Sequence, residues 1–200
     1  MKPELTLILI PAAGSPSSVI PANLEHQRRS EIAAFFAKHS LPHQIIWRTE
    51  ATLGSADFEG AEGRYVVVMD HDLRVPLSEI FPLLQTLTDQ NVPFTFAARK
   101  LPADHFDRRW RNALNEKLGS TFHDPFSPHW LGTAENFRSL SLSRPTSIEL
   151  LGPELLRASR QKNYKVLEVP IKLAAEWPQE QLTKWAKVQR AWRWLCFLCR

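Results

Sequence analysis

Four short runs of apolar residues, each bounded by turn residues, divide the first half of the chain. They are residues 5–10, 44–47, 65–69 and 94–98. Each run is shorter than an ordinary helix and contains β-branched or aromatic residues, which is typical of strands buried on both faces of a parallel sheet. We therefore expect these four segments to form the centre of an α/β fold.

The segments between these runs repeat apolar residues at the spacing of a helix. Residues 23–39 place Ile32 and Phe36 on one side, and residues 76–91 repeat the pattern with Pro76 near the start. Alternation of strand, helix and strand predicts a mostly parallel central sheet flanked by helices, with right-handed crossovers.

The pattern changes in the second half of the chain. Residues 104–118 form a polar segment of helical character, and residues 120–133, "STFHDPFSPHWLGT", predict a loop rich in Pro, His and aromatic residues. We expect the histidines to shape this loop or to be exposed, with a metal cluster of His123, Asp124 and His129 as the alternative.

Two prolines place the next elements. "GPELLRASRQKN", residues 152–163, predicts a helix with Pro153 in its first turn. "YKVLEVPIKLAAEW", residues 164–177, predicts a strand that Pro170 keeps near a sheet edge or a bulge, because proline cannot donate to a ladder.

The last segment, residues 179–200, predicts an amphipathic helix. Its apolar face carries Trp185, Val188, Trp192 and Leu195. Such a face most often packs on a core, but a basic helix with tryptophans is also typical of contact with an anionic lipid surface. The sequence leaves both roles open.

Composition limits the class of protein. A chain of 200 residues with 44% hydrophobic residues is expected to be one soluble globular domain, 1–200. A net charge of +4 is too small for a typical nucleic-acid-binding domain. Two cysteines, Cys196 and Cys199, rule out a disulfide framework, and no apolar stretch approaches the roughly 20 residues of a membrane span. We therefore expect a cytoplasmic protein without a nucleic-acid partner.

Candidate chemistry lies at the end of the third apolar run, in "RYVVVMDHDLRVP". Asp70 and Asp72 follow a buried strand, where open α/β sheets bind their ligands, and alternation along extended backbone would point both side chains the same way. Two neighbouring carboxylates repel unless a cation such as Mg²⁺ or Mn²⁺ holds them ionised. The alternative is a solvated turn in which an aspartate caps the helix near Pro76.

These segments, taken in order, resemble the inverting family-2 glycosyltransferases, and most closely the dolichyl- or polyprenyl-phosphate mannosyltransferase branch. The resemblance is carried by "LTLILIPA", "HQIIW", "AEGRYVVVMDHDLRVPLSEIFPLLQTL", "FTFAARK", "HDPFS", "IELL" and "RQKNYKVLEVPIK". It covers nearly the whole chain and implies a donor and metal half (1–100), an acceptor half (101–178) and a C-terminal amphipathic helix (179–200).

The resemblance implies a Rossmann-like GT-A fold and metal-dependent transfer of a sugar from a nucleotide-sugar donor. Asp70 and Asp72, the Asp-X-Asp motif, would hold Mg²⁺ or Mn²⁺ against the donor diphosphate. The ion would neutralise the negative charge that grows on the diphosphate as it leaves the sugar. Arg99 and Asp124 would face the acceptor and the reaction centre. A lipid-phosphate acceptor, met at the inner face of a membrane, needs no base, whereas a hydroxyl acceptor would make Asp124 the candidate base.

The donor's nucleoside pocket departs from the family pattern. Pro11 and Ala12 match the start of the segment after the first strand, but only Glu50 could replace the acids that follow the second, and residues 48–63 show no clear helical face. One alternative is therefore a catalytically degenerate glycosyltransferase-fold scaffold. A nucleotidyltransferase of related fold is weaker, because no Lys or Arg stands between Lys2 and Arg28 to hold a triphosphate.

Overall fold

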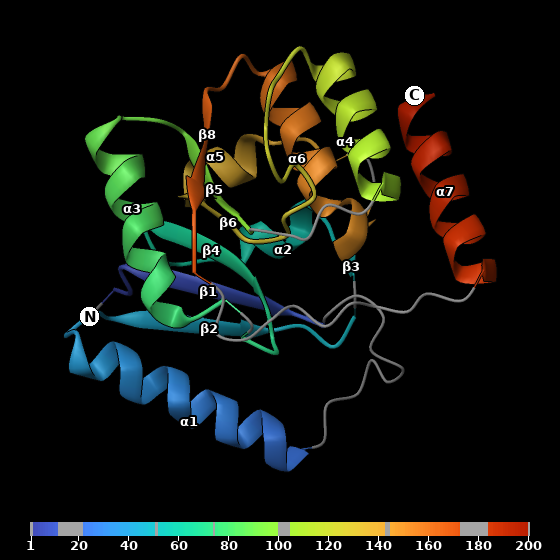
Figure 1. The fold of residues 1–200 in the computed structure, drawn as a ribbon. Coiled ribbons are helices and arrows are strands. Elements are labelled where there is room, and N and C mark those ends of the chain that lie inside the picture. Colours follow the sequence, from blue (N-terminus) through green and yellow to red (C-terminus); the bar gives the residue numbers. More distant parts are fainter. Residues whose placement is uncertain are drawn as a thin grey trace.

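The computed structural model describes residues 2–11, 22–50, 52–73, 75–99, 105–142, 145–172 and 184–199. Its centre is a six-stranded sheet with the order β2-β1-β4-β6-β5-β8 (Figure 1). The strands are β1 Leu5–Ile10, β2 His43–Trp47, β4 Tyr65–Asp70, β5 Phe94–Ala98, β6 Trp130–Thr133 and β8 Val166–Pro170. The four predicted strands are all present, but β2 lies at the sheet edge and is only partly buried, so the expectation of burial on both faces was wrong for this strand.

Most of the sheet is parallel, as predicted. β1 pairs in parallel with β2 and β4, and β5 pairs in parallel with β8, which ends at Pro170 on the sheet edge. β6 runs antiparallel to both of its neighbours, β4 and β5. The prediction of a loop throughout 120–133 was therefore wrong for Trp130–Thr133. Four residues are too few to show a repeating pattern of apolar positions. The strand β6 is stabilised instead by the two buried strands that flank it.

Helices cover both faces of the sheet (Figure 1). They are α1 Ala22–Lys38, α2 Ser55–Glu59, α3 Ile80–Asp89 with the 3₁₀ turn Leu77–Glu79 before it, α4 His105–Leu118, α5 Ala134–Ser139, α6 Ile148–Gln161 and α7 Lys184–Leu198. A second, two-stranded sheet pairs β3 Thr52–Leu53 with β7 Thr146–Ser147.

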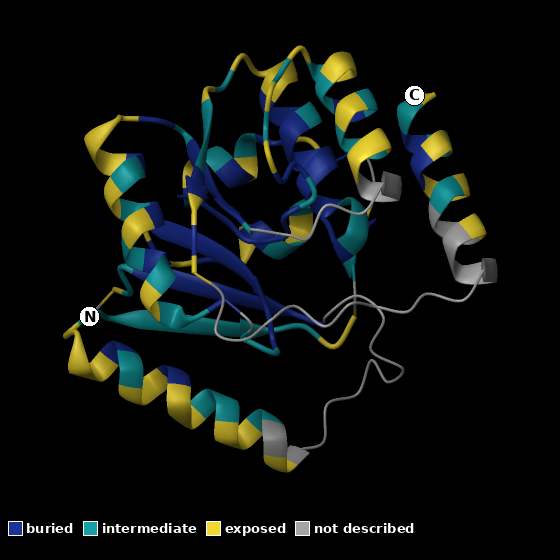
Figure 2. Cartoon of the chain, viewed as in Figure 1, coloured by how far each residue is buried: buried dark blue, intermediate teal, exposed yellow. Residues whose placement is uncertain are grey.

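The central strands are buried on both sides, which explains their uninterrupted apolar sequences (Figure 2). Along β1, Leu7 and Leu9 join a cluster with α1 and α3, whereas Ile8 and Ile10 join a cluster with α5 and α6. Because alternate side chains point to opposite faces, each strand contributes to both cores.

Two local expectations were wrong. α6 begins at Ile148, so Pro153 lies inside the helix rather than in its first turn. Burial of Ile148, Leu151 and Leu155 at helical spacing offsets the hydrogen bond that proline cannot make. Residues 48–63 also hold β3 and the five-residue α2, which is too short for a repeating apolar face; it is anchored by one ring, Phe58.

The C-terminal helix lies within the predicted range 179–200, between Lys184 and Leu198; residues 179–183 and 200 lie outside the described residues. It packs on the outside of α4 (Figure 1). Cys196 and Cys199, near its end, are free thiols. In the described ranges, no helix is both long and apolar enough to cross a membrane.

Candidate functional site

The candidate site lies at one edge of the central sheet, where β1, β4 and β5 end. Ile10 is in register with Asp70, which brings the ends of β1 and β4 together. Because β6 runs in the opposite direction, its beginning reaches the same edge, and the amide of Ala97 donates to the carbonyl of His129 at 3.0 Å. The sheet therefore gathers Asp70, Arg99 and His129 from three separate segments.

Asp70 ends the buried strand β4 and faces a histidine. Its Oδ2 lies 3.3 Å from Nε2 of His129, and the two side chains are only 2% and 1% exposed. A buried carboxylate is costly unless it is paired, so the imidazole stabilises Asp70 in this position. Nδ1 of His129 is buried and has no hydrogen-bond partner among the described residues. The sequence placed this histidine in a loop and gave no signal for its partner.

Asp72 lies in the turn after β4, and its side chain is 33% exposed. One carboxylate oxygen, Oδ1, lies 2.8 Å from Nδ1 of the preceding His71. Extended backbone ends at Asp70, so the alternation that would point both aspartates the same way does not reach residue 72. Asp72 is instead oriented by the imidazole beside it.

A stack of flat side chains holds that imidazole. The ring of His71 lies parallel to Trp47, the last residue of β2, with centroids 6.1 Å apart and an interplanar angle of 9°. The guanidinium of Arg29, on α1, lies 5.3 Å from the centroid of the Trp47 ring. Stacking and cation–π contact restrict the rotation of His71 and therefore of Asp72.

Arg99 and Asp124, both predicted to face the acceptor, form a buried bidentate pair. Nε and Nη2 of Arg99 donate to Oδ2 and Oδ1 of Asp124 at 2.6 and 3.0 Å, and the Arg99 amide also donates to Oδ2 at 3.1 Å. Such a fork is the strong geometry for an arginine and a carboxylate. Asp124 thus receives three hydrogen bonds from a single residue.

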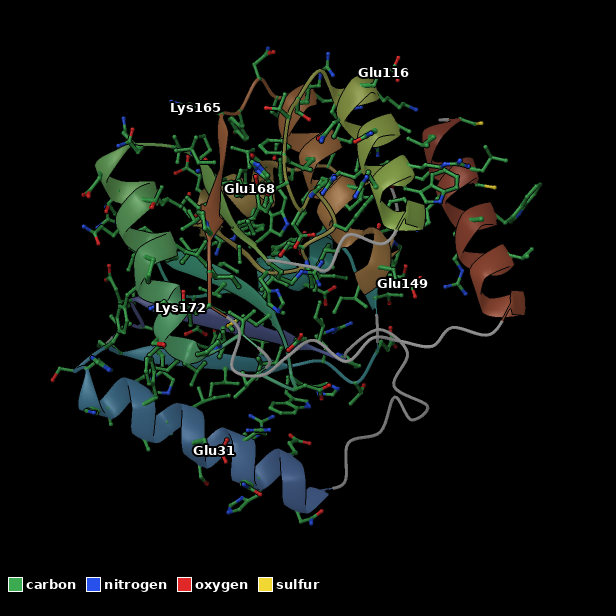
Figure 3. The ribbon with its side chains drawn as sticks, viewed as in Figure 1. Glu31, Glu116, Glu149, Lys165, Glu168 and Lys172 are labelled. Carbon is green, nitrogen blue, oxygen red and sulfur yellow. The ribbon has the colours of Figure 1, made fainter. Side chains whose placement is uncertain are left out.

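Glu168, on β8, holds the loop that presents Asp124 (Figure 3). Its Oε1 accepts from the Asp124 amide at 2.6 Å, and its Oε2 accepts from the His123 amide at 2.8 Å. Gly152 of α6 packs against this loop from the other side, where a Cβ would meet the carbonyls of Pro125 and Ser127 at 2.7 Å. The sequence showed neither contact, because each joins residues more than 20 positions apart.

The expected nucleoside residues are less tightly held. Pro11 is buried at the end of β1, and Ala12 lies outside the described residues. The side chain of Glu50 is 73% exposed, with its Oε2 4.0 Å from Nη2 of Arg48. Arg48 has a closer partner in Asp57, at 2.9 Å.

The described residues contain no group of three or more His, Cys, Asp or Glu side chains placed to share one ion. His123, Asp124 and His129 do not form the alternative metal cluster, since they bind Glu168, Arg99 and Asp70 respectively. Mg²⁺ usually keeps several waters and takes one or two carboxylates together with substrate phosphates. Asp70 and Asp72 offer ligands of that kind, and their role as a metal site stays a prediction.

Comparison with solved structures identifies the architecture. Glucosyl-3-phosphoglycerate synthase from Mycobacterium tuberculosis matches with a TM-score of 0.60 and 16% identity, over 98% of this chain and 81% of that chain. Its complex with uridine diphosphate matches with a TM-score of 0.56 and 15% identity, over 98% and 80% of the two chains. The fold is that of GT-A glycosyltransferases.

A third GT-A structure is the same synthase in complex with Mn²⁺, UDP-glucose and phosphoglyceric acid, with a TM-score of 0.53 and 15% identity over 98% of this chain and 80% of that chain. Protein-family models and curated proteins give no match. At identities of 15–16%, the structural match shows the fold alone, and it confirms the predicted GT-A fold. The mannosyltransferase branch stays a prediction.

Proposed function

We propose that this protein is a metal-dependent glycosyltransferase that transfers a sugar from a nucleotide-sugar donor to a phosphate-bearing acceptor. The observation that carries the proposal is the pair of aspartates at the end of β4 in a GT-A sheet, with Asp70 buried against His129 and Asp72 partly exposed. In open α/β sheets, ligands bind outside this edge.

In the proposed site, Asp70 and Asp72 hold Mg²⁺ or Mn²⁺ against the donor diphosphate. The ion would neutralise the charge that grows on the leaving diphosphate. The protein's own part is orientation: His129 fixes Asp70, and His71 fixes Asp72. Partners of this kind commonly set the affinity of a metal site. The fold neighbour crystallised with Mn²⁺ and UDP-glucose supports this assignment.

The state of Asp124 favours an acceptor that is already anionic. A general base needs a free oxygen in reach of the acceptor proton, whereas this carboxylate accepts three hydrogen bonds from Arg99. Arg99 would face the acceptor phosphate, and Asp124 would position Arg99. A phosphate needs no deprotonation at neutral pH.

The mannosyltransferase branch that the sequence resembles uses a lipid-phosphate acceptor, and we propose the same acceptor class for this protein. It would place the protein in the cytoplasm at the inner face of a membrane. Residues 1–100 would serve the donor and metal, and residues 101–178 the acceptor. Pro11, Ala12 and Glu50 would line the donor side, with Glu50 taking a ribose hydroxyl.

Thermal shifts with UDP- and GDP-sugars, each with and without Mn²⁺, test the proposal, because a ligand that binds only the folded state raises the melting temperature. We expect one donor to raise Tm only in the presence of Mn²⁺. Asp70→Asn and Asp72→Asn should abolish that shift, while Asp89→Asn, at the exposed end of α3, should preserve it. Retention of the shift in both site variants would contradict the metal assignment.

A second candidate, a non-catalytic scaffold of the same fold, is favoured by one observation, the exposure of Glu50 in place of the expected pair of nucleoside acids. Absence of any shift with every donor, at concentrations far above an ordinary dissociation constant, would favour the scaffold over the enzyme.

A further inference from the structure

An apolar stripe is exposed on α7. Among the side chains that the structure describes, the large hydrophobic ones that are exposed are Val188 (56%), Trp192 (66%) and Leu195 (46%). Steps of four and three residues place them on one side of the helix. A large apolar patch on a protein surface commonly marks an interaction site, and a tryptophan exposed to this extent is unusual.

The opposite side of α7 is already packed. Trp194 and Phe197 are buried, and Trp194 contacts Phe126 edge to face with ring centroids 4.3 Å apart. Nη1 of Arg193 lies 3.1 Å from Oε2 of Glu149 at the start of α6 (Figure 3). The helix is therefore fastened to the body of the protein by one side, and this attachment directs the stripe away from it.

The net positive charge of the chain lies in the segment that contains α7, residues 184–200. Residues 184–200 carry five of the 25 Lys and Arg residues and none of the 21 Asp and Glu residues. The rest of the chain is nearly neutral, with 20 basic and 21 acidic residues, so the whole net positive charge of +4 comes from this segment. Even with Arg193 paired to Glu149, the segment keeps an excess of positive charge, and an occupant that is both apolar and anionic matches it.

We propose that α7 is a docking surface for an anionic lipid bilayer, with Val188, Trp192 and Leu195 entering the interface. Basic helices with Trp and Leu on an apolar side bind bilayers in this way, by burial of apolar area and by attraction to anionic head groups. A second copy of the chain would bring two basic segments together, and a nucleic acid would leave the stripe exposed to water.

The position of α7 links this surface to the candidate site. Phe126, which Trp194 contacts, belongs to the loop between Asp124 and His129. A bilayer bound to the stripe would be separated from this loop by the width of one helix, about 10 Å. The inference rests on α7 itself and holds whether or not the acceptor is a lipid phosphate.

Co-sedimentation of the full chain with vesicles tests the inference. Vesicles of phosphatidylcholine with phosphatidylglycerol should bind the protein, vesicles of phosphatidylcholine alone should bind it much less, and high salt should weaken the binding. These vesicles contain no polyprenyl phosphate and no donor, so a failure of the proposed enzymatic function would leave the result unchanged.

A triple variant and its matched control locate the contact. Val188→Glu, Trp192→Glu and Leu195→Glu together should weaken binding to the anionic vesicles by at least about tenfold. Ala33→Glu, Ala34→Glu and Ala37→Glu, at exposed positions of α1, change the net charge equally and should have a much smaller effect. Circular dichroism checks that each variant is folded. The single change Trp192→Ala should also weaken binding to the anionic vesicles.

Three results would overturn the proposal: wild-type protein that does not bind anionic vesicles, a triple variant that binds as well as its α1 control, or a wild-type dimer in sedimentation velocity that the triple variant converts to monomers. The last result would make a second copy the occupant of the stripe.

Discussion

The end of β4 and the segment after β2 lie at the same edge of the sheet but are built differently. At the end of β4, Asp70 is buried and its partner His129 comes from a segment 59 residues away. After β2, Glu50 is largely exposed, and its nearest cation, Arg48, is two residues away. Burial with distant partners holds a carboxylate in one position, whereas local contact in water does not. Asp70 is therefore held in one position, whereas Glu50 is adaptable.

Removal of a buried acid should show the largest difference between the two regions. Asp124→Ala leaves the guanidinium of Arg99 buried without its carboxylate, so we expect the free energy of unfolding to fall by about 3–5 kcal/mol. Asp57→Ala breaks the partly exposed pair with Arg48 and the hydrogen bond that Asp57 Oδ2 accepts from the Gly54 amide, and should cost about 1–2 kcal/mol. Urea denaturation measures both. Equal losses would contradict the contrast between a buried and a partly exposed carboxylate.

A substitution at His129 tests whether the partner of Asp70 sets the affinity of the metal site. His129→Asn removes the imidazole beside the carboxylate, and Mn²⁺-dependent donor binding should weaken by about 10- to 100-fold. Titration calorimetry with Mn²⁺ and the donor nucleotide gives the affinity. His123→Asn, at an exposed histidine bound to Glu168, is the control and should bind normally. A larger loss of donor binding in His123→Asn than in His129→Asn would contradict this role of His129.

The smallest effect is expected at Glu50. Glu50→Gln should leave the stability unchanged and weaken donor binding by about tenfold or less, because the amide oxygen can still accept a hydrogen bond from the ribose hydroxyl. Glu59→Gln, on the exposed end of α2, serves as the matched control in the same assay. Complete loss of donor binding in Glu50→Gln would mean that the nucleoside side depends on a single acid, against the contrast drawn above.

The architecture followed from local sequence to a large extent. The runs at 5–10 and 94–98 became strands with the predicted bounds, because burial on both faces requires continuous apolar residues. Pro170 correctly indicated an edge strand, because proline has no amide to donate to a neighbouring strand. Pro153 wrongly indicated the start of a helix, because the packing of α6 outweighed the hydrogen bond that proline cannot make.

The sequence by itself determined the four strands of the first half, the helices between them and the position of Asp70 at the end of β4, since these depend on neighbours within a few residues. Only the tertiary structure decided that His129 meets Asp70, that Glu168 holds the loop of Asp124, and that α7 packs by Trp194 and exposes Trp192. Those contacts join residues far apart in the chain or depend on which side of a helix finds a partner. No pattern along one segment encodes them, because their free energy arises only when the sheet and its covering helices come together.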